Sequence, residues 1–353
     1  MSATSENARL SSLEEGLQRL VVREFGPEFR VSGLAEMIDG HAGLTFGFEV
    51  LDRAGRLVKP YVLKLAPVGV TRRGNTDVYR QAPLLRGLYA AGLPVPDVPF
   101  ASPDEDLLGT PFIVMEKLPG RVFVAWEPDA SFSREVDAVR SLWLQAARML
   151  ARIHTVDWQK ILADWEAPRS LREELDRWAP VLRHAKDPTW GDEGPALHHA
   201  GETLHAVLTQ GFPDERPIGV VHGDFQPGNI LFQNGQAMGV IDWELASIGA
   251  KGADLGWLLM MSDAAAWHPG WRPVAPVGRE ELIDAYRAEG GPAYLNLDWY
   301  QALSQYRLAC IACLNVKLHR SGKRTDALWE RFAPSVSTLF SRGQELARRA
   351  IAS

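Results

Sequence analysis

Four residues in one short region have the types and spacing needed to handle a divalent cation and a transferable phosphate. Asn229 lies five residues after Asp224, and Asp242 directly follows an apolar run, 238–241, that is expected to be a strand. Magnesium prefers oxygen ligands, commonly one or two carboxylates or amides with phosphate and water. In phosphoryl transfer with this Asp-to-Asn offset, the Asp takes the proton of the accepting hydroxyl and the Asn holds magnesium. His222 precedes Asp224 by two positions and is expected to support the loop, with direct proton transfer as the alternative.

A simpler interpretation of these residues is a polar turn or a helix cap. A lone Asp before an Asn is usually part of such a turn. Here, however, three polar positions, two apolar strands and a downstream carboxylate occur together. Phosphoryl transfer needs positioning, charge neutralisation and one group to orient the nucleophile, and this combination supplies all three.

The same residues carry a resemblance to a known family. The runs HGDFQPGNILF (222–232), IDWE (241–244) and ADLG (253–256) closely resemble the aminoglycoside phosphotransferase and choline kinase superfamily of small-molecule kinases. The run WELASIG resembles the branch related to the kinase domain of the acyl-CoA dehydrogenase 10/11 proteins.

The resemblance covers about residues 30–320 and implies an α+β, protein-kinase-like bilobal fold. Residues 1–116 would form a small N-terminal nucleotide-binding lobe with an antiparallel sheet. Residues 117–353 would form a mainly helical catalytic and acceptor-binding lobe.

The resemblance also implies where ATP and Mg²⁺ bind. By its position in the family pattern, Lys64 in the apolar run 61–65 is the candidate phosphate-binding lysine, although a lysine at an exposed strand edge explains this run as well. Gly43 lies in a loop that would cover the nucleotide, although a plain hairpin turn explains this loop as well. Adenine would meet the backbone near Glu116 and Leu118.

One position departs from the family pattern. The family often has Glu where this chain has Gln81, and Gln offers Lys64 a hydrogen bond without charge. We therefore expect a weaker pair and less firmly bound nucleotide. Asp254 resembles a family residue that braces the catalytic loop, although a helix cap explains it equally well. Glu244 is expected to pack near Trp243 rather than reach the metal.

Composition narrows the class of protein. The net charge of −6 argues against a general nucleic-acid or membrane binder. The only cysteines, Cys310 and Cys313, lie in an apolar helical run, which favours core packing over a metal or redox site. Few cysteines, no signal-peptide pattern and no long apolar run predict a cytoplasmic location.

Hydrophobic periodicity predicts the remaining elements. Residues 1–10 are polar and expected to be mobile, with a helix starting at Ser12. Strands are expected at 29–37, 46–50, 61–65 and 112–115, and helices near 76–91, 133–154, 169–184, 195–210, 280–288, 299–318 and 325–350.

The predicted activity is transfer of the ATP γ-phosphoryl group to a hydroxyl of a small molecule, with Asp224 as base and Asn229 and Asp242 as magnesium ligands. A metabolic acceptor is favoured over an aminoglycoside, because the acidic residues of 270–353 are scattered among Arg and Lys. The alternative class is a nucleotide-binding pseudokinase that acts as a binding module, suggested by Gln81. A protein kinase is disfavoured by the short segment between Asp242 and Asp254. Oligomeric state is open.

Overall fold

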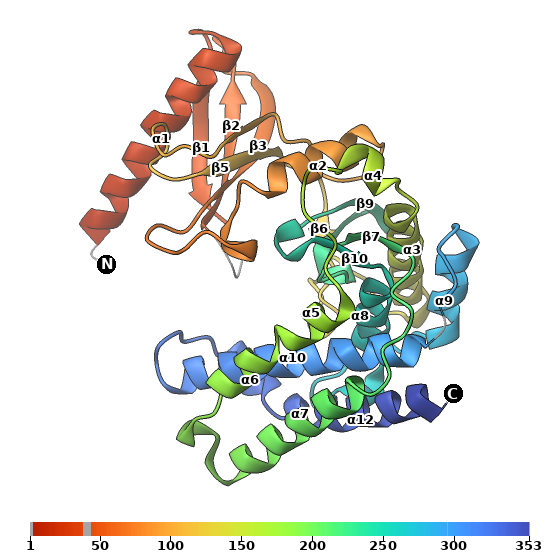
Figure 1. Cartoon of the computed structure of the whole chain (residues 1–353). Helices are drawn as coiled ribbons and strands as arrows, with labels where there is room; N and C mark the ends of the chain where they lie inside the picture. The colour runs from red at the N-terminus through yellow and green to blue at the C-terminus, as the bar shows by residue number, and fades with distance from the viewer. Residues whose placement is uncertain (1–2, 38–43, 295, 353) are drawn as a thin grey trace. The chain divides into compact units, whose positions relative to one another are not determined.

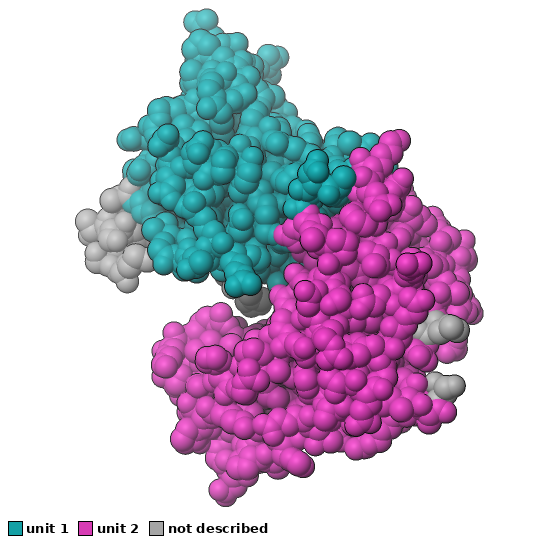
Figure 2. All heavy atoms as spheres, in the orientation of Figure 1, with its two compact units in different colours: residues 1–119, 161–165, 239–245 teal, residues 120–160, 166–238, 246–353 magenta. Residues whose placement is uncertain are grey.

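The computed structural model describes residues 3–37, 44–294 and 296–352. The chain forms two compact units, coloured separately in Figure 2. Unit 1 contains Met1–Pro119, Ile161–Trp165 and Gly239–Leu245, and unit 2 contains Gly120–Lys160, Glu166–Met238 and Ala246–Ser353.

Unit 1 is built on an antiparallel five-stranded sheet. The strand order is β1-β2-β3-β5-β4, with β1 Arg30–Glu36, β2 Leu44–Leu51, β3 Leu57–Leu65, β4 Phe100–Ser102 and β5 Phe112–Glu116. Alternate side chains of β2, among them Phe46, Phe48 and Val50, point into the core, as the period of a strand requires. Helix α1 (Ala3–Phe25) lies along this sheet and buries Leu17 and Leu20 against it (Figure 1).

The sheet places Lys64 in a semi-buried position. Lys64 is on β3, where its register partners are Thr45 of β2 and Ile113 of β5. Helix α2 (Gln81–Ala90) buries Gln81, Leu84 and Leu88. The short 3₁₀ turns η1 (Gly74–Thr76) and η4 (Trp243–Leu245) pack together in the same unit.

Unit 2 is mainly helical. Its strands form two small sheets, β7 (Ile218–Val221) with β10 (Ser247–Ala250), and β6 (Arg121–Val122) with β8 (Ile230–Gln233) and β9 (Gln236–Val240), the last crossing into unit 1. The long helices α10 and α12 pack on each other, and α8 packs on α10 (Figure 1). The helices are α3 Val136–His154, α4 Trp158–Ile161, α5 Leu171–Asp176, α6 Ala179–His184, α7 Gly194–Leu208, α8 Gly252–Ser262, α9 Arg279–Ala288, α10 Leu297–Arg320, α11 Leu328–Phe332 and α12 Ser335–Ala352.

Several predicted boundaries were wrong. The first helix begins at Ala3, not Ser12, so the polar residues 3–10 are helical. Helix α2 begins at Gln81 rather than near 76 because residues 74–76 form a separate 3₁₀ turn.

The two long helices expected at 169–184 and 325–350 are each divided. A proline occupies the start of α6, and Pro334 separates α11 from α12. Strand β9 ends at Val240, one residue earlier than expected.

Cys310 and Cys313 are free thiols buried on α10. Burial raises the pKa of both thiols, that of Cys313 to about 12, so neither is a thiolate near neutrality. The prediction of core packing is confirmed. None of the described helices is both long and apolar enough to cross a bilayer.

Candidate active site

The loop 222–229 of unit 2 is held at the end of a short antiparallel strand pair. Strand β7 pairs with β10, with Val221 opposite Ser247, and the chain then turns at Gly223, whose φ is 87°. Because this left-handed conformation is strained for residues with a side chain, Gly is the natural residue at this position. The 3₁₀ turn η3 (Pro227–Asn229) closes the loop before β8.

Within this loop, both carboxylate oxygens of Asp224 are oriented by neighbouring amides. Gln226 Nε2 donates to Asp224 Oδ1 at 2.9 Å, and Asn229 Nδ2 donates to Asp224 Oδ2 at 3.0 Å and to the Asp224 carbonyl at 2.8 Å. Both hydrogen bonds of the Asn229 side chain use its nitrogen, and its amide oxygen has no hydrogen bond to the described residues. That oxygen is the atom that a magnesium ion would use.

His222 supports the loop through its ring nitrogen. The backbone N–H of Asp224 donates to His222 Nδ1 at 3.2 Å, and the imidazole is fully buried. This bond ties the imidazole to the backbone of the loop, as the supporting role requires.

A buried carboxylate braces the loop from below. Asp254, in the first turn of α8, accepts hydrogen bonds from the backbone N–H groups of His222 at 2.6 Å and Gly223 at 2.9 Å. His154 Nε2 lies 3.5 Å from the same carboxylate, and His154 Nδ1 lies 2.7 Å from the Tyr286 hydroxyl. The expectation that Asp254 braces the catalytic loop is confirmed.

The protonation states of His154 and Asp254 at neutral pH are compatible with their contact. Burial lowers the pKa of His154, although its contact with Asp254 opposes the shift. Burial opposes ionisation of Asp254, but hydrogen bonds from His154 and the Gly223 N–H outweigh it and lower the pKa of Asp254. The pair is therefore a neutral imidazole beside an ionised carboxylate.

A second group of candidate residues lies in unit 1, around Lys64. Lys64 Nζ lies 3.0 Å from Asp242 Oδ1 and 3.9 Å from Glu244 Oε2. Asp242 has a φ of 66°, a conformation that is uncommon outside glycine and concentrates at functional sites. The segment after β9 thus brings two carboxylates to the amine of β3.

Among the described residues, Lys64 pairs with the carboxylates of Asp242 and Glu244 and not with a side chain of α2. Gln81 is buried at the start of α2 and is not among the hydrogen-bond partners of Lys64. Arg80, next to it, donates from Nη1 to the Glu244 carbonyl at 3.1 Å, and its guanidinium lies 4.9 Å from the Trp165 ring centroid.

The residues expected near adenine lie at the end of β5. The Glu116 N–H donates to the Asp97 carbonyl at 2.9 Å, and its carboxylate pairs with Lys59 at 3.1 Å. Leu118 is half-buried, and a Cβ added at Gly239 would come within 2.4 Å of its side chain. Gly43 lies outside the described residues.

From the sequence, Glu244 was expected to pack near Trp243 and not to approach Lys64. Arg80 and His154 were not predicted to support the site. Glu244 follows Asp242 by two residues, and this acidic spacing after a strand was the available signal. His154 lies 100 residues from Asp254, so no local pattern could have joined them.

Comparison with known proteins assigns the family. A model of the phosphotransferase enzyme family, APH, matches residues 41–300. The chain belongs to this family. Among curated relatives, acyl-CoA dehydrogenase family member 11 of Gallus gallus is 28% identical over 305 residues, covering 82% of this chain and 38% of that protein. Family member 10 of Mus musculus is 26% identical over 308 residues, covering 83% and 27%. The chain therefore spans only about a third of the length of these relatives.

Solved structures agree on the fold of this phosphotransferase. A protein from Ralstonia eutropha described as a candidate aminoglycoside phosphotransferase has a TM-score of 0.72 at 22% identity, covering 95% of this chain and 98% of its own. Spectinomycin phosphotransferase, solved with ADP and spectinomycin, has a TM-score of 0.63 at 14% identity, covering 94% and 98%. The predicted fold class and the resemblance to the acyl-CoA dehydrogenase 10/11 branch are confirmed.

Proposed function

We propose that this phosphotransferase moves the γ-phosphoryl group of ATP to a hydroxyl of a small molecule in a magnesium-dependent reaction. The observation that carries the proposal is the geometry of the loop 222–229. There, Asp224 is oriented by Gln226 and Asn229, and the loop is fixed by the buried Asp254.

Asp224 has the role of base. A carboxylate can accept the proton of an acceptor hydroxyl, and the amides of Gln226 and Asn229 orient this one. The fixed orientation means that little reorganisation is needed when the proton moves.

Asn229 and Asp242 are the proposed magnesium ligands, and Lys64 is the proposed phosphate ligand. The donor set fits magnesium, because one amide oxygen and one carboxylate oxygen are the hard oxygen ligands that this ion takes. Magnesium supplies charge neutralisation at the transferring phosphate. Asp242 is 39% exposed, so its carboxylate is accessible to a ligand.

The proposed acceptor is a metabolite rather than an antibiotic. Relatives named as acyl-CoA dehydrogenase family members favour a metabolic acceptor, and we propose a hydroxyacyl compound. The proposed partners are small molecules, not nucleic acid or membrane, in keeping with the net charge of −6. A cytoplasmic location is part of the same proposal.

A melting experiment tests the nucleotide part of the proposal. The full chain is heated with ATP plus magnesium, with ATP alone and with neither. A ligand at 100 times its dissociation constant adds about 2.7 kcal/mol to the free energy of unfolding. We expect a magnesium-dependent rise that Asp242→Ala removes.

The matched control is Asp129→Ala, which removes an exposed carboxylate that pairs with Arg121 at 2.7 Å. This variant should keep the magnesium-dependent rise. A magnesium-dependent rise would be followed by assays of ADP release with hydroxyl compounds. No rise in the unmodified protein at millimolar nucleotide would instead favour a binding module that acts without nucleotide.

A further inference from the structure

Unit 2 contains three arginines gathered around one acidic side chain. Glu174 of α5 lies 3.0 Å from Arg169 Nη1 and 3.1 Å from Arg177 Nη1, and it accepts a hydrogen bond from Trp178 Nε1 at 3.0 Å. Arg307 of α10 is the third cation near this carboxylate. Arg169, Arg177 and Arg307 are called the arginine cluster below.

Arg307 is the unusual member of the cluster. Its guanidinium lies 5.0 Å from the Trp178 ring centroid and 4.6 Å from that of Trp257. Its Nε–H is shielded from solvent and has no hydrogen-bond partner among the described residues. Because an arginine has five N–H donors and a shielded donor without a partner is costly, this guanidinium is poised to receive an oxyanion.

A second arginine of the same helix shows that stacking on an indole does not by itself leave a guanidinium without hydrogen bonds. Arg320 lies 4.9 Å from the Trp190 ring centroid. It also donates to Glu330 at 2.9 and 2.7 Å and to the Thr189 carbonyl at 3.0 Å. Arg320 is therefore a paired structural residue and provides a natural comparison for Arg307.

The arginine cluster has a surplus of positive charge that a ligand can reach. Three arginines surround Glu174, and Glu173 also lies near Arg169, so positive charge remains in excess within the group. Burial lowers the pKa of Arg177, and the charges of Arg169 and Arg307 add to this shift while Glu174 opposes it. The side chains of Arg169 and Arg177 are 30% and 38% exposed, which leaves room for an anion to approach.

The cluster is attached to the elements that hold the catalytic loop. The Arg169 N–H donates to the Ile248 carbonyl of β10 at 2.8 Å, and β10 pairs with β7, which leads into His222. The backbone of Arg169 therefore lies two strand spacings, or about 10 Å, from strand β7. On the other side, Arg307 stacks on Trp257, which lies three residues after Asp254 on α8.

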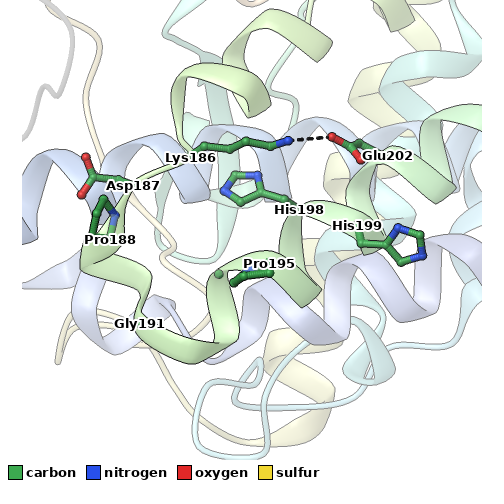
Figure 3. Close-up of a pocket in the computed structure, with 9 residues that line it drawn as sticks. Lys186, Asp187, Pro188, Gly191, Pro195, His198, His199 and Glu202 are labelled. Carbon is green, nitrogen blue, oxygen red and sulfur yellow. Dashed lines mark hydrogen bonds and ion pairs between the residues drawn. The ribbon is translucent and has the colours of Figure 1, made fainter.

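A pocket elsewhere in unit 2 lacks this surplus charge. A cavity of about 460 Å³ lies there, lined by residues of 186–202 that are labelled in Figure 3. Lys186 pairs with Glu202 at 2.9 Å, and Asp187 pairs with Lys317 at 3.5 Å. Because its charges compensate one another, this pocket offers an anion less than the arginine cluster does.

We propose that the arginine cluster binds a phosphate group carried by the acceptor, which deepens the proposed function and rests on it. A phosphate monoester carries about −1.5 to −2 charges near neutrality and offers three acceptor oxygens, so it can pair with more guanidinium N–H groups than a carboxylate can. The acceptor class is thus a hydroxyl compound that also carries a phosphate.

The test titrates the full-length protein with methyl phosphate at constant ionic strength, with acetate as the carboxylate arm. The readouts are the melting temperature and the ¹H–¹⁵N signal of the Arg307 Nε–H, which is assigned by its loss in Arg307→Gln. We expect saturable binding that shifts this signal and is at least about tenfold weaker in Arg307→Gln. Arg320→Gln, on the same helix, should bind methyl phosphate as the unmodified protein does.

The titration is repeated in Lys64→Ala to remove phosphate binding at the proposed nucleotide site. Equal methyl phosphate binding with and without Arg307, or no binding at all, would overturn the proposal. Acetate binding as tight as methyl phosphate would overturn the phosphate assignment. The melting shift with ATP and magnesium should survive in Arg307→Gln, so failure of the kinase function would appear separately, as loss of that shift in the unmodified protein.

Discussion

The loop 222–229 of unit 2 and the Lys64 group of unit 1 hold their charged residues in different ways. Beside the loop, the Asp254 carboxylate of α8 is buried and accepts hydrogen bonds from two backbone N–H groups of the loop. Around Lys64, the contacts are ion pairs between side chains, and Asp242 remains 39% exposed. The first arrangement fixes a backbone, and the second leaves side chains that can exchange partners.

This difference matches the tasks proposed for the two regions. A base must be held in one orientation, because its contribution depends on geometry in the transition state. Groups that bind phosphate and magnesium must exchange their contacts for those of a ligand in each cycle. Partly exposed ion pairs are also screened by salt, whereas buried hydrogen bonds are screened much less.

The largest expected effect tests the fixed region. Asp224→Ala should lower turnover by about 10²–10⁴-fold, because it removes the general base. The melting shift with ATP and magnesium should remain, because the side chain is not a proposed nucleotide ligand. Turnover comparable to that of Asp129→Ala would refute the assignment of the base and, with it, the functional meaning of the fixed loop.

The second prediction concerns acid stability of the brace. The folded-state pKa of His154 is lowered, so below the ordinary value of 6.5 the unfolded chain binds a proton that the folded chain does not. The free energy of unfolding should therefore fall as pH decreases below about 6.5, by at most about 1.4 kcal/mol per pH unit for this group. Asp254, whose pKa is also lowered, adds a further loss below its ordinary 3.8, as pH falls towards the folded-state pKa.

Denaturant unfolding from pH 7.5 to 5 measures this dependence. His154→Gln should flatten the slope, whereas His205→Gln, which removes a partly exposed imidazole paired with Asp176, should change it less. If His154→Gln does not fold, the ring protons of His154 in the unmodified protein provide the reading by NMR. Their titration near pH 6.5 would contradict the buried, neutral brace.

The smallest expected effect concerns the ion pairs around Lys64, whose side chains can exchange partners. Glu244→Gln should weaken ATP–magnesium binding by up to about fivefold at low salt, because a partly buried ion pair contributes little more than a surface pair. Gln81→Ala should have a smaller effect, because Gln81 does not contact Lys64 in the hydrogen bonds described. Calorimetry of ATP binding at low and high salt measures both. A larger loss of ATP affinity in Gln81→Ala than in Glu244→Gln would indicate that a side chain of α2 is the partner of Lys64.

Much of the candidate site could be predicted from local sequence. His222, Asp224 and Asn229 lie within eight residues, so turn chemistry alone brings them together. The antiparallel sheet of unit 1 was also predicted, from alternating apolar residues and from the resemblance to a family, but the order of its strands was not. Helix boundaries were less predictable at 169–184 and 325–350, where prolines divided segments with continuous helical periodicity.

The sequence by itself therefore determined the class of fold, the polar loop 222–229 and the candidate residue types. The tertiary structure decided which charges meet: Lys64 with Asp242 across 178 residues, His154 with Asp254 across 100, and Arg307 with Glu174 of α5. The physical reason is that backbone turns act over a few residues, whereas ion pairs and buried hydrogen bonds depend on distance in space and on exclusion of water. No local pattern reports either quantity.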